Sequence, residues 1–214
     1  MATAKSNAKV KAEATVETAA PAEAVATETP QVSFRLVVCA YPGTGEQLAK
    51  VWLKMTGEEP LVIIVQRDAS LTDTLAEAVA NPEIADTFIL VPANCVPCAP
   101  ISLDELKGPF VFVDVAGSRH YCDRLPVFFS KEALVEVLTS SPEDDETLMK
   151  TYYKNNLHRP IEGGFRIGNL VTPVYSANPC ENLVIEAFVR KKFVTASPEG
   201  YKAIARLVDQ YLLG

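Results

Sequence analysis

Two cysteines separated by two residues are the sharpest chemical signal in the sequence. Cys95 and Cys98 lie in a compact loop that follows a short apolar run and ends at Pro100. A C-x-x-C pair at a strand end can form a dithiol redox site. It can also supply half of a zinc site, with His120 and Cys122 as the other half. Because Pro100 opposes the helix that a thioredoxin-like domain places directly after its first cysteine, we favour two ordinary loop cysteines.

Two aspartates stand at the ends of apolar runs that have the composition of strands. Asp68 follows Leu61–Val65, and Asp114 lies at the end of Phe110–Val115. In α/β domains the chemistry gathers in loops beyond strand ends. An enzyme that acts on a sugar nucleotide uses acids at such places. Either aspartate could equally cap a turn.

Three polar stretches carry groups that bind phosphate or sugar oxygens. Tyr41–Glu46 contains two glycines and resembles a phosphate-cradling turn, but it lacks the G-x-G-x-x-G spacing and a P-loop lysine, which favours a plain turn. His158 and Arg159 could pair with a sugar or phosphate oxygen, or they could form a pair that stabilises their loop. Arg190–Lys192 could hold a phosphate, although charge clusters of this length are usually solvated surface.

The first half of the chain alternates between strand and helix patterns. Apolar, β-branched runs predict buried strands, and apolar residues at i, i+3, i+4 and i+7 predict helices with one buried stripe. This order implies a parallel sheet with right-handed crossovers. The predicted elements are a strand at Ser33–Ala40, a helix at Glu46–Thr56, a strand at Leu61–Val65, a helix that Ser70 or Thr72 caps and that runs to about Ala80, and strands at Phe88–Val91 and Phe110–Val115.

The second half is less regular. It predicts elements of mixed type around a polar, glycine-containing stretch, and it shows no internal repeat. These elements are a short extended run at Leu125–Phe129, helices at Lys131–Leu138 and Pro142–Tyr153, the irregular stretch at Tyr152–Ile167, a strand at Asn169–Tyr175 and an amphipathic helix at Pro198–Leu213.

Composition and charge exclude several classes of protein. The net charge is −7, and a general nucleic-acid binder needs a basic face. No apolar run approaches the roughly 18 to 20 residues that span a bilayer. Five cysteines is an odd number, and Cys39 lies inside an apolar run, which suits a reducing compartment better than a disulfide scaffold. We therefore expect a cytoplasmic protein.

The first 31 residues differ from the rest. They are rich in Ala, Thr, Val, Glu and Pro and contain no aromatic residue. They lack the apolar region of a secretory signal and the arginines of a transit peptide. We expect residues 1–31 to form a disordered tether and residues 32–214 to form a single α/β domain.

Several short stretches together carry a family resemblance. They are Leu36-Val37-Val38, Leu61–Val65 with Asp68, Asn81–Leu90, Leu125–Glu132, Tyr153 with Asn155 and Arg159-Pro160, and Lys192-Phe193-Val194 with the closing helix. The chain thereby resembles small bacterial and phage-encoded glycosyltransferase-like proteins, related to the nucleotide-diphospho-sugar transferase (GT-A) fold and to stealth-type sugar-phosphate transferases. The resemblance implies a GT-A-like, mostly parallel sheet flanked by helices.

The departures from this family bear on function. The family places an acidic pair after the third strand, where it holds a divalent metal on the sugar-nucleotide pyrophosphate; here the sequence reads Pro92-Ala93-Asn94. Neither Ala nor Asn replaces a carboxylate as a ligand for Mn²⁺ or Mg²⁺. The histidine that often precedes Leu-Pro is Arg124. Arg124 or Lys192 could substitute as cations, but we expect loss of catalysis.

The resemblance therefore implies a glycosyltransferase-like protein that is impaired at its metal site and keeps at most sugar-nucleotide or glycan binding. Its catalytic candidates are Asp114 and Arg124, and its substrate-binding candidates are Tyr41, Asp68, Asn94, Arg124, His158, Arg159 and Lys192. One alternative is an assembly protein, virion-associated if a phage encodes it, that holds a partner through residues 1–31. The other is a redox or zinc protein centred on Cys95 and Cys98.

Overall fold

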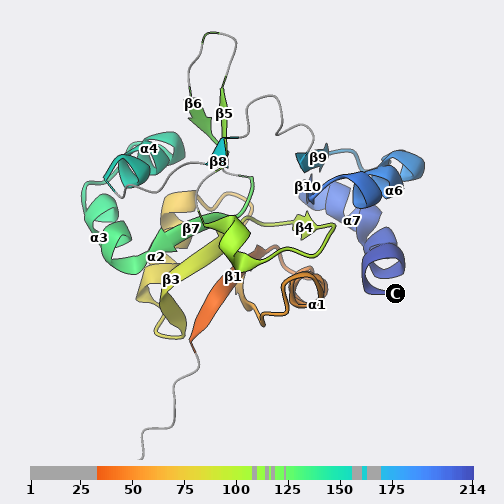
Figure 1. Cartoon of the computed structure of the whole chain (residues 1–214), viewed down its shortest axis with the longest axis horizontal. Helices are drawn as coiled ribbons and strands as arrows, with labels where there is room; N and C mark the ends of the chain where they lie inside the picture. The colour runs from red at the N-terminus through yellow and green to blue at the C-terminus, as the bar shows by residue number, and fades with distance from the viewer. Residues whose placement is uncertain are drawn as a thin grey trace, which may run out of the picture. The chain divides into compact units, whose positions relative to one another are not determined.

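A computed structural model describes residues 33–107, 110–113, 116, 119–122, 124–155, 161–162 and 170–214 (Figure 1). The residues from Val32 to Gly214 form one compact unit. The predicted tether, residues 1–31, lies outside the described residues.

The central sheet has four strands in the order β2-β1-β3-β7. β1 (Phe34–Ala40) pairs in parallel with β2 (Leu61–Ile64) on one side and with β3 (Ile84–Val91) on the other. β7 (Val127–Ser130) runs antiparallel to β3. The mixed α/β class and the mostly parallel sheet are confirmed. The chain crosses from β1 to one neighbour and then back to the other, so the strand order reverses between β1 and β3.

Helices cover both faces of this sheet because β1 is apolar on both sides. The side chains of Leu36 and Val38 join the core under α1 (Gly45–Thr56), whereas Val37 and Cys39 join the core under α2 (Leu71–Ala80). The predicted stripe of α1 is buried, with Leu48, Val51 and Trp52 fully covered. Ser70 caps α2 as predicted, since its hydroxyl accepts a hydrogen bond from the Asp73 amide at 3.0 Å.

The α2 side of the sheet continues into two further helices. α3 (Lys131–Thr139) and α4 (Asp145–Asn155) share the core that contains Leu75 and Phe129. The hydroxyl of Tyr152 accepts a hydrogen bond from the Ser130 amide at 2.7 Å and so ties α4 to the end of β7.

The α1 side carries a small second sheet. Its strands are β4 (Cys95–Pro97), β10 (Phe193–Ala196) and β9 (Val171–Val174), in the order β4-β10-β9. A 3-10 turn, η1 (Leu103–Leu106), follows β4. α6 (Glu181–Arg190), α7 (Pro198–Val208) and the π-helical turn η3 (Asp209–Leu213) pack around this sheet, and Figure 1 shows them in blue beside β9 and β10.

The predicted fourth parallel strand is wrong. β5 (Phe110–Val113) belongs to a third sheet, with β6 (Arg119–Tyr121) antiparallel and β8 (Ile161–Glu162) parallel to it. β7 occupies the place beside β3 instead, because Val127 and Phe129 are buried in the core under α2. Among the described residues, no helix combines the length and apolar character needed to cross a membrane.

Candidate functional site

A cavity of about 280 Å³ opens where the three parallel strands end. Tyr41 follows β1, Gln66 follows β2, and Pro92 and Ala93 follow β3, and all four line it. Ligands of open α/β sheets bind outside the carboxyl ends of the strands, where the strand order reverses. The cavity lies at that place in this sheet.

The turn after β1 presents the side chain of Tyr41 to the cavity. Gly43 has a φ of 87°, a left-handed conformation that glycine adopts without steric cost. The Thr44 hydroxyl donates to the Tyr41 carbonyl at 3.0 Å, which holds the turn closed ahead of α1. The sequence prediction and the structure agree in placing Tyr41 at the end of a strand, and the structure puts it on the cavity wall.

The turn after β3 is built differently. Asn94 is fully buried, and its φ of 57° is a left-handed conformation that asparagine tolerates better than most residues. Its carbonyl accepts a hydrogen bond from the Ala196 amide at 3.2 Å, and its Oδ1 lies 3.4 Å from the Thr44 hydroxyl. Its Nδ2 has no hydrogen-bond partner within the described part of the chain. Asn94 is thus buried within the turn and, unlike Ala93, is not among the residues that line the cavity.

Arg124 brings a positive charge to the cavity. Its guanidinium lies over the ring of Tyr175, 5.4 Å from the centroid, and hydrogen-bonds to the Tyr175 hydroxyl. Stacking on an aromatic ring fixes the plane of a guanidinium and leaves its remaining N–H groups free to bind an anion. Both Arg124 and Tyr175 line the cavity.

Asp145 brings the one carboxylate found among the described lining residues of this cavity. It opens α4, where a negative charge is stabilised by the helix dipole. A second cavity of about 420 Å³ adjoins the first, since Arg124 and Asp145 line both. His120 and Glu146 also line the second cavity, with His120 Nδ1 lying 3.4 Å from Glu146 Oε1.

Other predicted site residues lie elsewhere. Asp68 is exposed beyond β2 and does not line the cavity. Lys192 forms an ion pair with Glu105 at 2.7 Å, and this hydrogen bond lowers the pKa of the Glu105 carboxyl. Lys192 is also not among the residues that line the cavity. Asp114, His158 and Arg159 lie outside the described residues.

The two cysteines of the C-x-x-C pair are buried in β4 and just after it. Burial raises the pKa of Cys95 well above its usual value and that of Cys98 to about 12. Since the thiolate is the reactive and metal-binding form, burial disfavours the reactive form of both thiols. The Trp52 indole donates to the Cys95 carbonyl at 2.9 Å, which gives this segment a structural role under α1.

The described residues do not form a metal site. Within the described ranges, no group of three or more His, Cys, Asp or Glu side chains could hold one. This covers Cys95, Cys98, His120 and Cys122 as a zinc set. It also covers the position after β3, where Pro92 and Ala93 offer no ligand side chain for Mn²⁺ or Mg²⁺.

Sequence reasoning missed several residues of the cavity. Ser197 directly follows β10, and Gln66 lies two residues beyond the end of β2, which is a local signal that could have identified both. Asp145 and Tyr175 come from α4 and from the end of β9, and only the folded chain brings them together. Cys39, from β1, also lines the cavity, and burial raises the pKa of its thiol to about 12.

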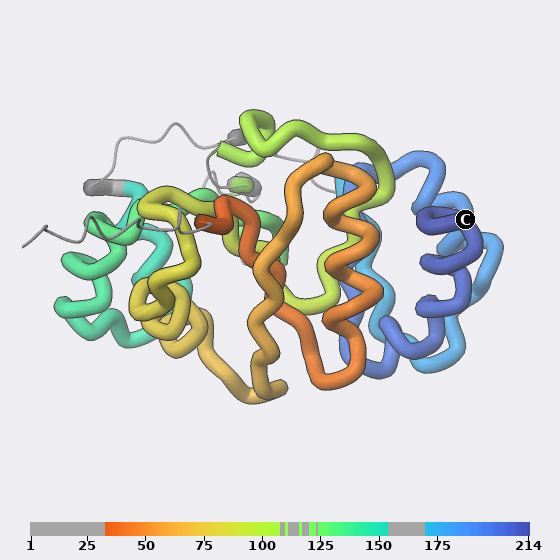
Figure 2. The backbone as a smooth tube through the Cα atoms, turned by 90° about the horizontal axis from the view of Figure 1, so that it is seen from below, coloured from red at the N-terminus to blue at the C-terminus, as the bar shows by residue number. Residues whose placement is uncertain are grey.

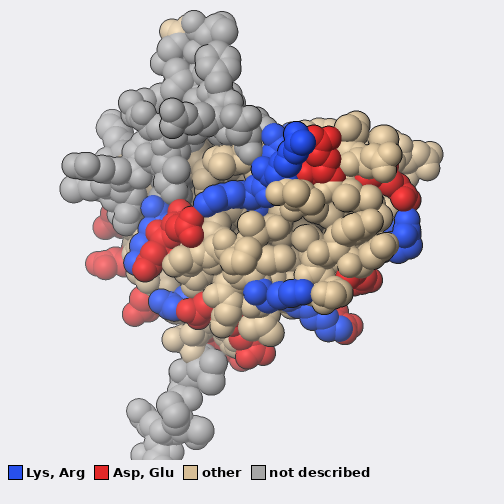
Figure 3. All heavy atoms as spheres, turned by 45° about the vertical axis from the view of Figure 1, so that its right-hand side comes forward, with Lys and Arg blue, Asp and Glu red and all other residues tan. Residues whose placement is uncertain are grey.

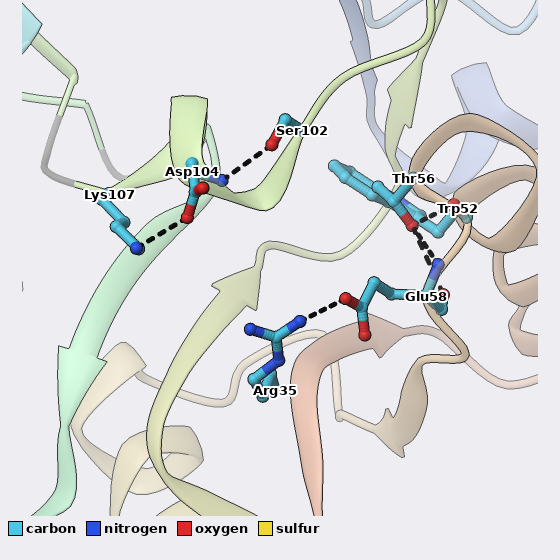
Figure 4. A network of polar contacts seen from close by, with 7 residues as sticks. All are labelled: Arg35, Trp52, Thr56, Glu58, Ser102, Asp104 and Lys107. Atoms are coloured by element: carbon cyan, nitrogen blue, oxygen red, sulfur yellow. Dashed lines mark hydrogen bonds and ion pairs between the residues drawn. The ribbon is translucent and has the colours of Figure 1, made fainter.

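Several charged side chains away from the cavity are paired with each other. Figure 4 shows one such region, where Arg35 binds Glu58 and Lys107 binds Asp104 at 2.6 Å. On the face that Figure 3 shows, basic and acidic side chains are interspersed around a broad uncharged area. Neither region resembles a basic surface for nucleic acid.

Comparisons with protein families and curated proteins give no indication of function. No protein-family model matches the sequence, and a search of curated proteins finds no match.

Proposed function

We propose that this protein is a glycosyltransferase-like binding protein that takes a sugar nucleotide into the cavity beyond β1, β2 and β3. The observation that carries the proposal is the position of this cavity, at the reversal of strand order in a mostly parallel sheet. The sheet order β2-β1-β3 with an antiparallel β7 is compatible with a GT-A-like architecture.

The lining of the cavity supports a polar, hydroxyl-rich ligand. Tyr41 and Gln66 offer a hydroxyl and an amide group, which both donate and accept hydrogen bonds. The hydroxyls of Thr74 and Ser197 also line the cavity, but they already donate to the carbonyls of Ser70 and Tyr175. The cavity, at about 280 Å³, is near the lower end of the range of about 300–1,000 Å³ that small-molecule sites occupy. It therefore suits one ring unit with its substituents, and the rest of a sugar nucleotide would extend outward.

Arg124 supports an anionic group on that ligand. An arginine pairs with two phosphate oxygens at once, and Tyr175 orients the guanidinium for this. Transfer of the sugar is a separate matter. A leaving diphosphate without a metal loses several kcal/mol of charge stabilisation, and Ala93 stands where a metal ligand would be needed. We therefore propose binding without metal-dependent transfer.

Titration calorimetry of the full chain with UDP- and GDP-sugars tests this proposal, once with Mn²⁺ and once with EDTA. We expect one of these donors to bind equally in both conditions. Arg124→Gln should weaken binding by about tenfold or more. Arg190→Gln is the matched control, since Arg190 is an exposed arginine on α6 that pairs with Glu186 and does not line the cavity. Absence of binding by every donor, or transfer that requires Mn²⁺, would overturn the proposal.

A further inference from the structure

β2 is an edge strand of the central sheet, and on its outer side the backbone N–H and C=O groups face no other described strand. β2 stands at the end of the strand order β2-β1-β3-β7, and β1 is the one described strand that pairs with it. The Val65 amide donates to the Ala40 carbonyl of β1 at 2.9 Å. In a parallel pair, alternate residues of a strand face the neighbour. The N–H and C=O groups of Val62 and Ile64 therefore point toward the open edge.

The side chains on this edge are apolar and accessible. Ile64 is 49% exposed, which is unusual for a large aliphatic residue in a strand. Val62 and Ile64 lie against the start of α1, because a Cβ added to Gly45 would meet Val62 Cγ1 at 3.0 Å and Ile64 Cδ1 at 3.3 Å. Figure 2 looks onto this edge, where the amber segment after α1 lies in front of β1.

We propose that two copies of the chain pair antiparallel through β2 and form one continuous sheet. An antiparallel pair exchanges both backbone hydrogen bonds between residues directly opposite each other. Outward-facing Val62 then pairs with Ile64 of the second copy, and Ile64 pairs with its Val62, which gives four hydrogen bonds about a twofold axis at Ile63. The two exposed Ile64 side chains lie on the same face and cover each other's Val62.

The charges that flank β2 favour a second copy in this orientation. The register that pairs Val62 with Ile64 places Glu59 opposite Arg67 of the other copy, twice. Glu59 is exposed and forms no ion pair within the described part of the chain. Arg67 is exposed and binds Glu199 at 2.8 Å through one nitrogen, so further N–H groups remain for Glu59. Parallel pairing of two β2 strands would instead bring the same charges side by side.

One contact in this register is unfavourable. Glu58 comes opposite Asp68 of the other copy, although Glu58 is already neutralised by Arg35 (Figure 4). The strand is also short, at four residues, so few hydrogen bonds form. We therefore expect a dimer whose population rises with protein concentration in solution. The proposal of this pairing does not rest on what the cavity binds.

Sedimentation velocity of the full chain over a series of concentrations tests the proposal. The weight-average mass should rise from 23.2 kDa toward twice that value. Ile64→Lys should raise the dissociation constant by about tenfold or more, because it places two like charges beside each other at the interface. Val135→Lys is the matched control, since Val135 is equally exposed, at 49%, on α3. It should leave the dissociation constant unchanged.

A charge exchange identifies the register. Glu59→Arg alone should weaken the dimer, and Glu59→Arg combined with Arg67→Glu should restore it. Amide hydrogen exchange adds a site-specific readout, since the Val62 and Ile64 amides should become protected only as the dimer forms. A monomer at every concentration overturns the proposal. A dimer that Ile64→Lys leaves intact, or one without protection of these two amides, overturns it as well.

Discussion

Two turns border the cavity, one after β1 and one after β3. Both contain a residue at positive φ, but they differ in whether that turn is accessible from the cavity. The first turn contains Gly43 at positive φ and is closed by the hydrogen bond from the Thr44 hydroxyl to the Tyr41 carbonyl. It leaves Tyr41 on the cavity wall. The second turn uses Asn94 at positive φ, fully buried and tied to β10 through its carbonyl. The first turn is therefore available to a ligand, whereas the second is part of the packing.

This difference affects whether residue 94 could take part in metal binding. A carboxylate at residue 94 would supply a metal ligand only if its side chain reached the cavity. In this structure a carboxylate there would be buried beside the Thr44 hydroxyl and would not line the cavity. A buried charge without a partner costs several kcal/mol. The chain has thus given this position a structural role that conflicts with metal binding.

The largest expected effect concerns α1, which follows the first turn and packs against β4, the strand after the second turn. Trp52 on α1 is fully buried, stacks on Phe193 with ring centroids 6.3 Å apart and donates to the Cys95 carbonyl. Trp52→Ala should lower the free energy of unfolding by about 3–5 kcal/mol, because it leaves a large cavity and an unpaired carbonyl. Denaturant titration measures this. A loss below about 1 kcal/mol would show that α1 does not hold β4 in place.

A smaller effect should separate the two turns directly. Asn94→Val forces a β-branched residue into the left-handed region and should cost about 1–3 kcal/mol of stability. Tyr41→Val, at the cavity wall, should change stability far less. Equal losses in denaturant titrations of the two variants would contradict the distinction between a packed turn and an accessible one.

Alkaline pH should weaken the packing on both sides of the sheet. Burial raises the pKa of Cys39 and of Cys98 from 9.0 to about 12. A group whose pKa is higher in the folded state contributes its full stability below pH 9, and this contribution is lost as the pH rises toward 12. The loss approaches about 1.4 kcal/mol per pH unit for each thiol. Cys39→Ala and Cys98→Ala should each flatten the dependence of unfolding on pH, and an unchanged slope would contradict the burial argument.

Local patterns predicted the first half of the fold well. The stripe of Leu48, Val51 and Trp52 and the cap at Ser70 depend on neighbours a few residues away, so the sequence displays them. The partner of a strand is not displayed in this way. Phe110–Val113 has the composition of a buried parallel strand, yet it pairs with β6, and β7 is the strand that pairs with β3.

The candidate site was predictable to the extent that its residues follow strands. Tyr41 stands directly beyond β1 and was identified, whereas Asp145 and Tyr175 reach the cavity from distant elements. The sequence also displayed that residue 94 carries no charge. It did not display that this residue turns the chain at positive φ, because that depends on β10 packing against β4.

The most direct measurement of the central claim is an NMR titration of the isotope-labelled full chain with UDP- and GDP-sugars in EDTA. A ligand in the proposed cavity should shift the amide signals of Tyr41, Gln66 and Ala93, together with the side-chain signal of Arg124, and adding Mg²⁺ should not strengthen the binding. Unchanged signals at these four residues with every donor, or binding that appears only with Mg²⁺, would contradict the account.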